Sequence, residues 1–261
     1  GSAARLQPDG KLVVVGSALG ETYDIALARY NPDGSPDTSF SGDGRLVTDL
    51  GLTHEYGTAL TLQPDGKILV AGYRYAGSYV ESDFVLLRYY ADGSLDNTFS
   101  GDGIVLTDFS GADDFGHAIA RQTDGKIIVV GYSYEGSHKI ALARYNPDGS
   151  LDDTFDGDGM VATEYAEGPA YGNAVALQAD GKIVVAGSTA YGALDFVLMR
   201  YSSNGSLDGT FDTDGMLSTD FAGQFDECMA VLIQPDGKIL AAGYNDNASN
   251  DDFALARYNP N

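Results

Sequence analysis

The chain has 261 residues, of which 43% are hydrophobic, and its 38 acidic residues outnumber its 15 basic residues to give a net charge of −23. This charge repels nucleic acid and anionic membrane surfaces, because binding to phosphate groups needs lysine and arginine. No apolar run approaches the roughly 18 residues of a membrane span, and the single cysteine, Cys228, excludes an internal disulfide. The composition therefore predicts a protein with no nucleic-acid partner and no membrane insertion.

The first predicted hairpin has a sequence that returns four times. Residues 6–16 read LQPDGKLVVVG, and related phrases begin at residues 62, 121, 177 and 233. The alanine that opens each unit recurs with spacings of 56, 59, 56 and 56 residues, and such a period indicates a repeat architecture. We expect Gly1 and Ser2 to be an expression scar and residues 3–261 to form a single domain. The predicted repeats are residues 3–58, 59–117, 118–173, 174–229 and 230–261.

Four strands are predicted in each repeat, as the second repeat illustrates. Residues 58–63, 67–72, 83–90 and 103–109 are short apolar, β-branched or aromatic runs, and Gly, Pro and Asp separate them. In the first turn, Pro64 presets φ and Gly66 takes the left-handed position of a hairpin. No segment has a sustained helical period. The fifth repeat contains only the first three strands.

The second strand of each repeat determines the predicted fold. It is apolar almost throughout, as in KIVVAG at 182–187, so both faces of its sheet should be buried. Sheets stacked face to face in this way form a β-propeller. We therefore predict an all-β propeller of about five four-stranded blades built from ~56-residue repeats, one of which lacks a strand in this chain. A linear β-solenoid is the rival, although its rungs are usually shorter.

The incomplete fifth repeat leaves two alternatives. Either one blade has three strands, or the missing strand is supplied by a longer parent chain or a neighbouring copy. The second alternative makes self-association through the incomplete blade a candidate interaction.

Three motifs carry a resemblance to a known family. LQPDGKILVAG, DFALARYNP and DGSLDNTFSGDG resemble the bacterial delta-60 repeat, and the match extends over nearly the whole chain. Departures are mild, such as Thr123 and Ala179 in place of the turn proline. The resemblance implies a β-propeller in an exported or surface protein, and it supplies no catalytic residue. With the acidity and the many Gly, Asp, Ser and Tyr residues, it predicts a secreted or bacterial cell-surface location.

Loop lengths indicate where a ligand would bind. The loops between the second and third strands differ in length between repeats, and variable loops on a rigid scaffold usually carry binding sites. The loops that enter each next repeat should lie at the same end of the blades. Tyrosines and acids at that end suit sugar rings, and the alternative is that they only cover strand edges. The candidate ligand-binding residues are Tyr73, Tyr75, Tyr132, Tyr134, Tyr191, Tyr244, Glu55, Asp114 and Asp226.

Calcium is the candidate cofactor, and no other cofactor is indicated. TFDGDG (154–159) and TFDTDG (210–215) resemble the first half of a calcium loop but lack its terminal glutamate. The second aspartate of each segment recurs in the equivalent segment of all four complete repeats, which favours a turn-capping role for it. The candidate metal ligands are Asp156, Asp158, Asp212, Asp214, Asp246 and Asp251.

A recurring arginine, a recurring aspartate and the single cysteine are expected to have structural roles. An arginine and an aspartate recur in each complete repeat, as in Arg29 with Asp37 or Asp49, and we expect buried ion pairs. Cys228 stands where other repeats have glycine, and its sequence neighbours include no base, so it is expected to be a packing residue.

The sequence favours a non-catalytic exported or cell-surface module for binding or adhesion, which recognises a glycan or a protein through the variable loops. One alternative is a structural spacer in a larger surface protein. Another is an acid-lined propeller glycoside hydrolase or lyase, which would need two carboxylates roughly 5–10 Å apart across a cleft. The nucleophile motif G-x-S-x-G is absent from the sequence, so a serine hydrolase is not indicated.

Overall fold

A computed structural model describes residues 1–51, 54–75, 81–109, 113–189, 194–221, 225–246 and 250–260. Within these residues the regular elements are all β-strands, and no helix is long and apolar enough to span a membrane. Blades 1 and 2 contain β1 (Ala3–Leu6), β2 (Leu12–Leu19), β3 (Tyr23–Tyr30), β4 (Arg45–Thr48), β5 (Glu55–Leu62), β6 (Ile68–Tyr75), β7 (Ser82–Tyr89) and β8 (Ile104–Thr107). Blades 3 and 4 contain β9 (Asp113–Arg121), β10 (Ile127–Tyr134), β11 (His138–Tyr145), β12 (Met160–Thr163), β13 (Ala170–Leu177), β14 (Ile183–Thr189), β15 (Phe196–Tyr201) and β16 (Met216–Thr219). Blade 5 contains β17 (Phe225–Ile233), β18 (Ile239–Asp246) and β19 (Asp251–Tyr258).

Strands pair in chain order and antiparallel within every blade, which confirms the predicted four-strand repeat and the three-stranded fifth blade. The first strand of the second repeat begins at Glu55, three residues earlier than predicted, because a bulge after Gly57 carries the pairing further along β6. The same bulge occurs in blades 3 to 5. In blade 3 this bulge brings β9 and β10 so close that a Cβ on Gly131 would lie 1.8 Å from the carbonyl oxygen of Phe115. Glycine is therefore required at that position.

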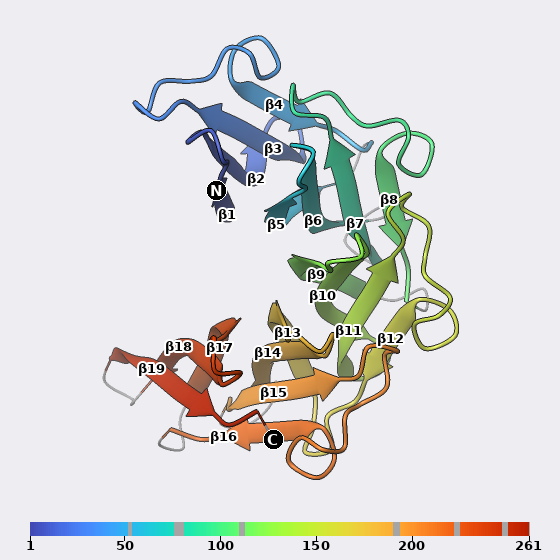
Figure 1. Ribbon diagram of the computed structural model, residues 1–261, viewed down its shortest axis with the longest axis vertical. Coiled ribbons are helices and arrows are strands. Elements are labelled where there is room, and N and C mark those ends of the chain that lie inside the picture. The colour runs from blue at the N-terminus through green and yellow to red at the C-terminus, as the bar shows by residue number, and fades with distance from the viewer. Residues whose placement is uncertain are drawn as a thin grey trace.

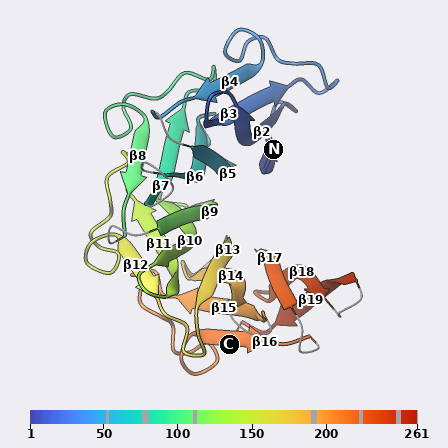
Figure 2. The same ribbon diagram turned by 180° about the vertical axis from the view of Figure 1, so that it is seen from behind.

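The five blades follow one another along an open arc (Figure 1). The first strand of each blade lies on the inner side of the arc, and β4, β8, β12 and β16 lie on the outer side. Blades 1 and 5 form the two separated ends of the arc, as the reverse view also shows (Figure 2).

Apolar side chains fill the interfaces between successive blades. Val13 and Leu27 of blade 1 pack with Val70 and Leu87 of blade 2, and equivalent clusters lie at the next three interfaces. The residues on the two sides of a strand therefore belong to two different interfaces, which explains why the second strands have no polar face.

Each complete blade also contains a buried ion pair that reaches its neighbour. The Nε of Arg29 lies 2.6 Å from Asp37, and the Nζ of Lys11 lies 2.8 Å from the same carboxylate. Hydrogen bonds from Lys11 and Ser39 hold the pKa of Asp37 well below its usual range. The Arg29 guanidinium also donates to the carbonyl of Ala91 in blade 2. The predicted ion pairs are thus confirmed, and the partner of Arg29 is Asp37. The equivalent pairs are Arg88–Asp96, Arg144–Asp152 and Arg200–Asp208.

Candidate functional site

The strand ends that border the variable loops and those that border the loops into each next blade lie at one end of the blades, because neighbouring strands are antiparallel. We call this end the variable-loop face. It collects side chains from the last residues of each second strand and from the first residues of the first and third strands.

A continuous row of aromatic rings crosses the variable-loop face from blade 1 to blade 4. Successive ring centroids in the row lie 5.5, 5.0, 4.8, 4.9 and 4.7 Å apart. Most of these rings are half-buried, so part of each stays accessible to a ligand. The members of this aromatic row are, in order, Tyr23, Tyr56, Tyr73, Phe115, Tyr132 and Tyr171.

Strand register generates the row. Tyr56 of β5 is the cross-strand partner of Tyr73 of β6, and the next blade repeats the arrangement with Phe115 and Tyr132. Directly opposed side chains lie within contact distance on one face of a sheet. In blade 4 the partner of Tyr171 is Ser188, so the alternation of rings stops there.

Tyr73 in the aromatic row and the two histidines beside the row are uncharged at neutral pH. Burial, followed by the neighbouring Tyr75 and Tyr56, raises the pKa of Tyr73 to about 12. Burial also lowers the pKa of His117 and of His138, whose rings lie 5.3 and 5.5 Å from that of Tyr132. The row therefore offers an apolar surface edged by protonated hydroxyl groups and neutral imidazoles.

The structure brings together some of the predicted ligand-binding tyrosines. Tyr73 and Tyr132 belong to the row, the Tyr75 ring lies 5.9 Å from those of Tyr73 and Phe115, and the Tyr134 ring lies 4.9 Å from that of His138. Tyr244 lies in blade 5 and donates a hydrogen bond to Glu227. Tyr191 lies outside the described residues.

Sequence reasoning missed four members of the row, Tyr23, Tyr56, Phe115 and Tyr171. Three of them stand in one repeating column, directly after the position of Glu55 and its equivalents. That column was the signal that could have found them.

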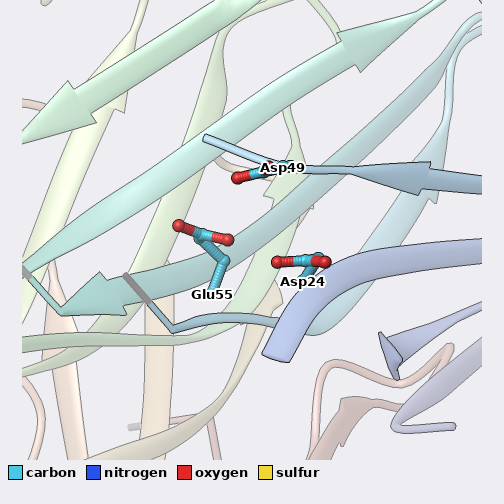
Figure 3. Close-up of side chains that lie close together, drawn as sticks. All are labelled: Asp24, Asp49 and Glu55. Carbon is cyan, nitrogen blue, oxygen red and sulfur yellow. The ribbon is translucent and has the colours of Figure 1, made fainter. Parts of the chain in front are cut away.

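The predicted acids Glu55, Asp114 and Asp226 are each 0% exposed and lie at the junctions between blades. Glu55 is the first residue of β5, and its carboxylate gathers with those of Asp24, on β3, and Asp49, just after β4 (Figure 3). Asp195, Asp220 and Asp226 form the equivalent group between blades 4 and 5. In each group one oxygen atom of every carboxylate lies within 4.8 Å of the others.

Each of these two groups offers three carboxylate oxygens at a spacing that a divalent cation could bridge. Calcium binds carboxylate oxygens at about 2.3–2.6 Å, so two ligands on opposite sides of the ion lie ~4.8 Å apart. Burial, followed by the charges of Asp220 and Asp226, raises the pKa of Asp195. A divalent cation would offset this repulsion. Each group could therefore hold one metal ion.

The other two junctions carry compensating positive charge. Between blades 2 and 3, the equivalent acid Asp83 forms an ion pair with Arg74 at 3.2 Å. Burial, the largest effect, together with the charges of the nearby Asp108 and Asp83, raises the pKa of Asp114 at this junction to about 7. Between blades 3 and 4, the positions of Asp24 and Glu55 are taken by Lys139 and Ala170. The first and fourth junctions are therefore the candidate metal sites.

The metal ligands predicted from sequence lie elsewhere. The carboxylates of Asp158 and Asp214 accept the backbone N–H groups of Met160 and Met216 at 2.9 Å, as expected for turn caps. Asp156 and Asp212 precede them at positive φ. Asp246 and Asp251 are opposed across β18 and β19. Among the described residues, the two groups of three carboxylates include none of these six acids.

A family model described as "Domain of unknown function (DUF5122) beta-propeller" matches residues 7–40, 63–99, 122–155, 178–211 and 234–261. No curated protein sequence matches the chain.

Three solved structures resemble the fold. A protein of unknown function from Bacteroides caccae is 13% identical with a TM-score of 0.57, and the match covers 99% of this chain and 77% of that one. The periplasmic gluconolactonase PpgL from Pseudomonas aeruginosa is 17% identical with a TM-score of 0.53, covering 98% and 71%. A GH43 endo-arabinanase from Bacillus licheniformis is 15% identical with a TM-score of 0.50, covering 97% and 91%. At these identities the likeness concerns the fold alone.

Proposed function

The chain belongs to the DUF5122 β-propeller family, the delta-60 repeat family that its motifs resemble, and from this premise we propose that it is a non-catalytic, exported or cell-surface module that binds a glycan. The observation that carries the proposal is the continuous aromatic row on the variable-loop face. Aromatic rings with polar edges suit the apolar faces and hydroxyl groups of sugars. Because the row extends over four blades, it fits an oligosaccharide better than a single small molecule.

The position of the acids supports binding without catalysis. A glycoside hydrolase needs two carboxylates that face one substrate. Asp114 and Asp226 are fully buried, and each accepts a backbone N–H from its own entry loop, at 2.6 Å from Phe109 and Phe221 respectively. These bonds suit carboxylates that hold loops in place beneath the face.

Calcium is proposed as a structural ion at the first and fourth junctions. An ion there would link the third strand of one blade to the first strand of the next and so fix the loops on either side. The test is isothermal titration with calcium after chelation. We expect Glu55→Gln to remove binding at the first junction and Asp158→Asn, in the turn predicted from sequence, to leave it unchanged. The reverse pattern would move the site to the turn.

A glycan-array screen of the chain, with calcium and after chelation, tests the glycan proposal. We expect a reproducible glycan, and we expect Tyr73→Ala combined with Tyr132→Ala to weaken its binding more than tenfold. Tyr30→Ala, a half-buried tyrosine at the opposite end of blade 1, is the matched control. Full binding by the double variant would reject the aromatic row as the site. A blank array in both conditions would reject a glycan ligand and favour a protein partner or a spacer role.

A further inference from the structure

No described strand pairs with the outer edge of β19, whereas a fourth strand completes each of the other blades. In blades 1 to 4 the backbone N–H of the third-strand arginine donates to a glycine carbonyl just before the fourth strand, as from Arg200 to Gly215 at 2.8 Å. Strand N–H groups alternate in direction. The N–H groups of Phe253, Leu255 and Arg257 therefore point to the edge of β19 that has no partner strand among the described residues.

Two cations lie beside this edge. In each complete blade the equivalent arginine and lysine converge on one aspartate eight residues after the arginine, as Arg200 and Lys182 do on Asp208 at 2.7 and 3.0 Å. Among the described residues of blade 5, Lys238 forms an ion pair only with the turn residue Asp236, and the exposed Arg257 forms none. No described residue occupies the position eight residues after Arg257, where the complete blades have the aspartate.

The adjoining face of blade 5 is apolar and open. Phe253 is 103% exposed and Leu255 is 63% exposed, whereas the equivalent Phe196 and Leu198 of blade 4 are 0% exposed because blade 5 covers them. Met229, Ala242 and Phe253 line a hollow of about 480 Å³ on this face. The edge and the cations thus match those that blade 4 presents to its own segment 208–219, and the face matches the one that blade 4 presents to blade 5.

We propose that blade 5 binds a further repeat of its own type, which enters with a segment of the pattern D-x-[ST]-F-x-x-D-G-x-x-x-T. The four complete blades contain this segment at residues 37–48, 96–107, 152–163 and 208–219. Its aspartate would pair with Arg257 and Lys238, and its last four residues would add to β19 as a fourth strand. The proposal is independent of the glycan-binding function.

A second copy of this chain does not supply that segment. Each of the four is already docked on the next blade, as where Phe40 packs against Gly93 and the N–H of Ser41 donates to the carbonyl of Asp92. The hydroxyl groups of Thr48 and Tyr89 also lie 2.7 Å apart across the interface. A neighbouring copy would have to open one of its own blades to release a segment.

The experiment uses a peptide of residues 205–220, added to the full chain and, separately, fused after Asn261. Hydrogen exchange is read residue by residue in β19. We expect exchange at Phe253, Leu255 and Arg257 to slow more than tenfold in both formats. Exchange at Ala254 and Ala256 should change less, because their N–H groups point towards β18.

A peptide with Asp208→Asn and Phe211→Ala is the matched control for the ligand, and Arg257→Gln is the control for the chain. Each should reduce binding at least tenfold. Equal protection with the altered peptide, or no alternation along β19, would overturn the proposal. Sedimentation of the chain alone tests whether a second copy is the occupant. If the chain forms oligomers and Arg257→Gln dissociates them, the occupant is another copy, and the proposal is overturned as well.

Discussion

Replacing Asp152 with asparagine tests the idea that a buried carboxylate ties each blade together. Asp152 is 2% exposed, and its Oδ2 lies 2.6 Å from both Arg144 Nε and Lys126 Nζ. Its Oδ1 accepts the hydroxyl of Thr154 at 2.7 Å. Asparagine keeps the shape and one acceptor, so the change removes the charge and little else.

The expected loss is about 3 kcal/mol in the free energy of unfolding. Removing one partner of a buried pair typically costs ~3–5 kcal/mol, because the other charge is left uncompensated. The low end applies here because the Lys126 side chain is 25% exposed and can turn its ammonium group to water, whereas Arg144 cannot. A loss of this size is a large part of the ~5–15 kcal/mol that stabilises a typical domain.

Equilibrium urea unfolding at pH 7 measures the effect, with the exposed neighbour Asp153→Asn as the matched control. The control should change the free energy of unfolding by less than about 0.5 kcal/mol. Burial opposes ionisation of Asp152, but Lys126, Thr154 and Arg144 outweigh it and hold its pKa well below the usual value. The stabilisation is therefore complete above the unfolded pKa of about 3.9 and is lost as the pH falls through the folded pKa. A loss below about 1 kcal/mol at pH 7 would refute the reasoning.

Three further predictions concern single buried groups. The pKa of Asp114, raised to about 7, means that the folded state holds a proton that the unfolded state releases, so stability should fall from pH 5 to pH 8, and Asp114→Asn should abolish this fall in urea titrations. Gly131→Ala should lower the free energy of unfolding by at least about 2 kcal/mol because of the clash with a neighbouring carbonyl, whereas Gly20→Ala should be nearly neutral in the same titration. Cys228, whose pKa burial raises to about 12, should react with a disulfide reagent at pH 8 only after unfolding in guanidinium chloride, and rapid reaction of the folded chain would contradict its packing role.

The fold was predictable because each repeat specifies the same local structure. The hairpin turn recurs with glycine at positive φ, as at Gly66, and the apolar second strand requires a neighbour on both faces. The Arg29–Asp37 pair was predictable for the same reason, since both residues recur at one spacing. The open arc was not predictable, because one repeat defines its contact with the next blade but not the total rotation that accumulates over five blades.

The site was only partly predictable, because its groups come from different blades. Asp24 and Asp49 belong to blade 1 and Glu55 to blade 2, and only face-to-face stacking of the blades brings the three carboxylates together. Tyr56 was missed because the bulge after Gly57 extends β5 three residues beyond the predicted start. The variable loops indicated the tyrosines at the ends of the second strands, whereas most of the rings between them stand in the column directly after Glu55 and its equivalents, which the prediction placed outside the strands.

The arginine bridges between blades connect each blade only to its immediate neighbour, and the arc leaves the two end blades unconnected to each other. Mechanical tension applied to the two ends of the chain would therefore act on the blades in series, with no closing contact to share the load. Blades would detach one at a time, and each would release about 190 Å of extended chain for its ~56 residues. The chain would then lengthen stepwise under tension while its remaining blades stay folded.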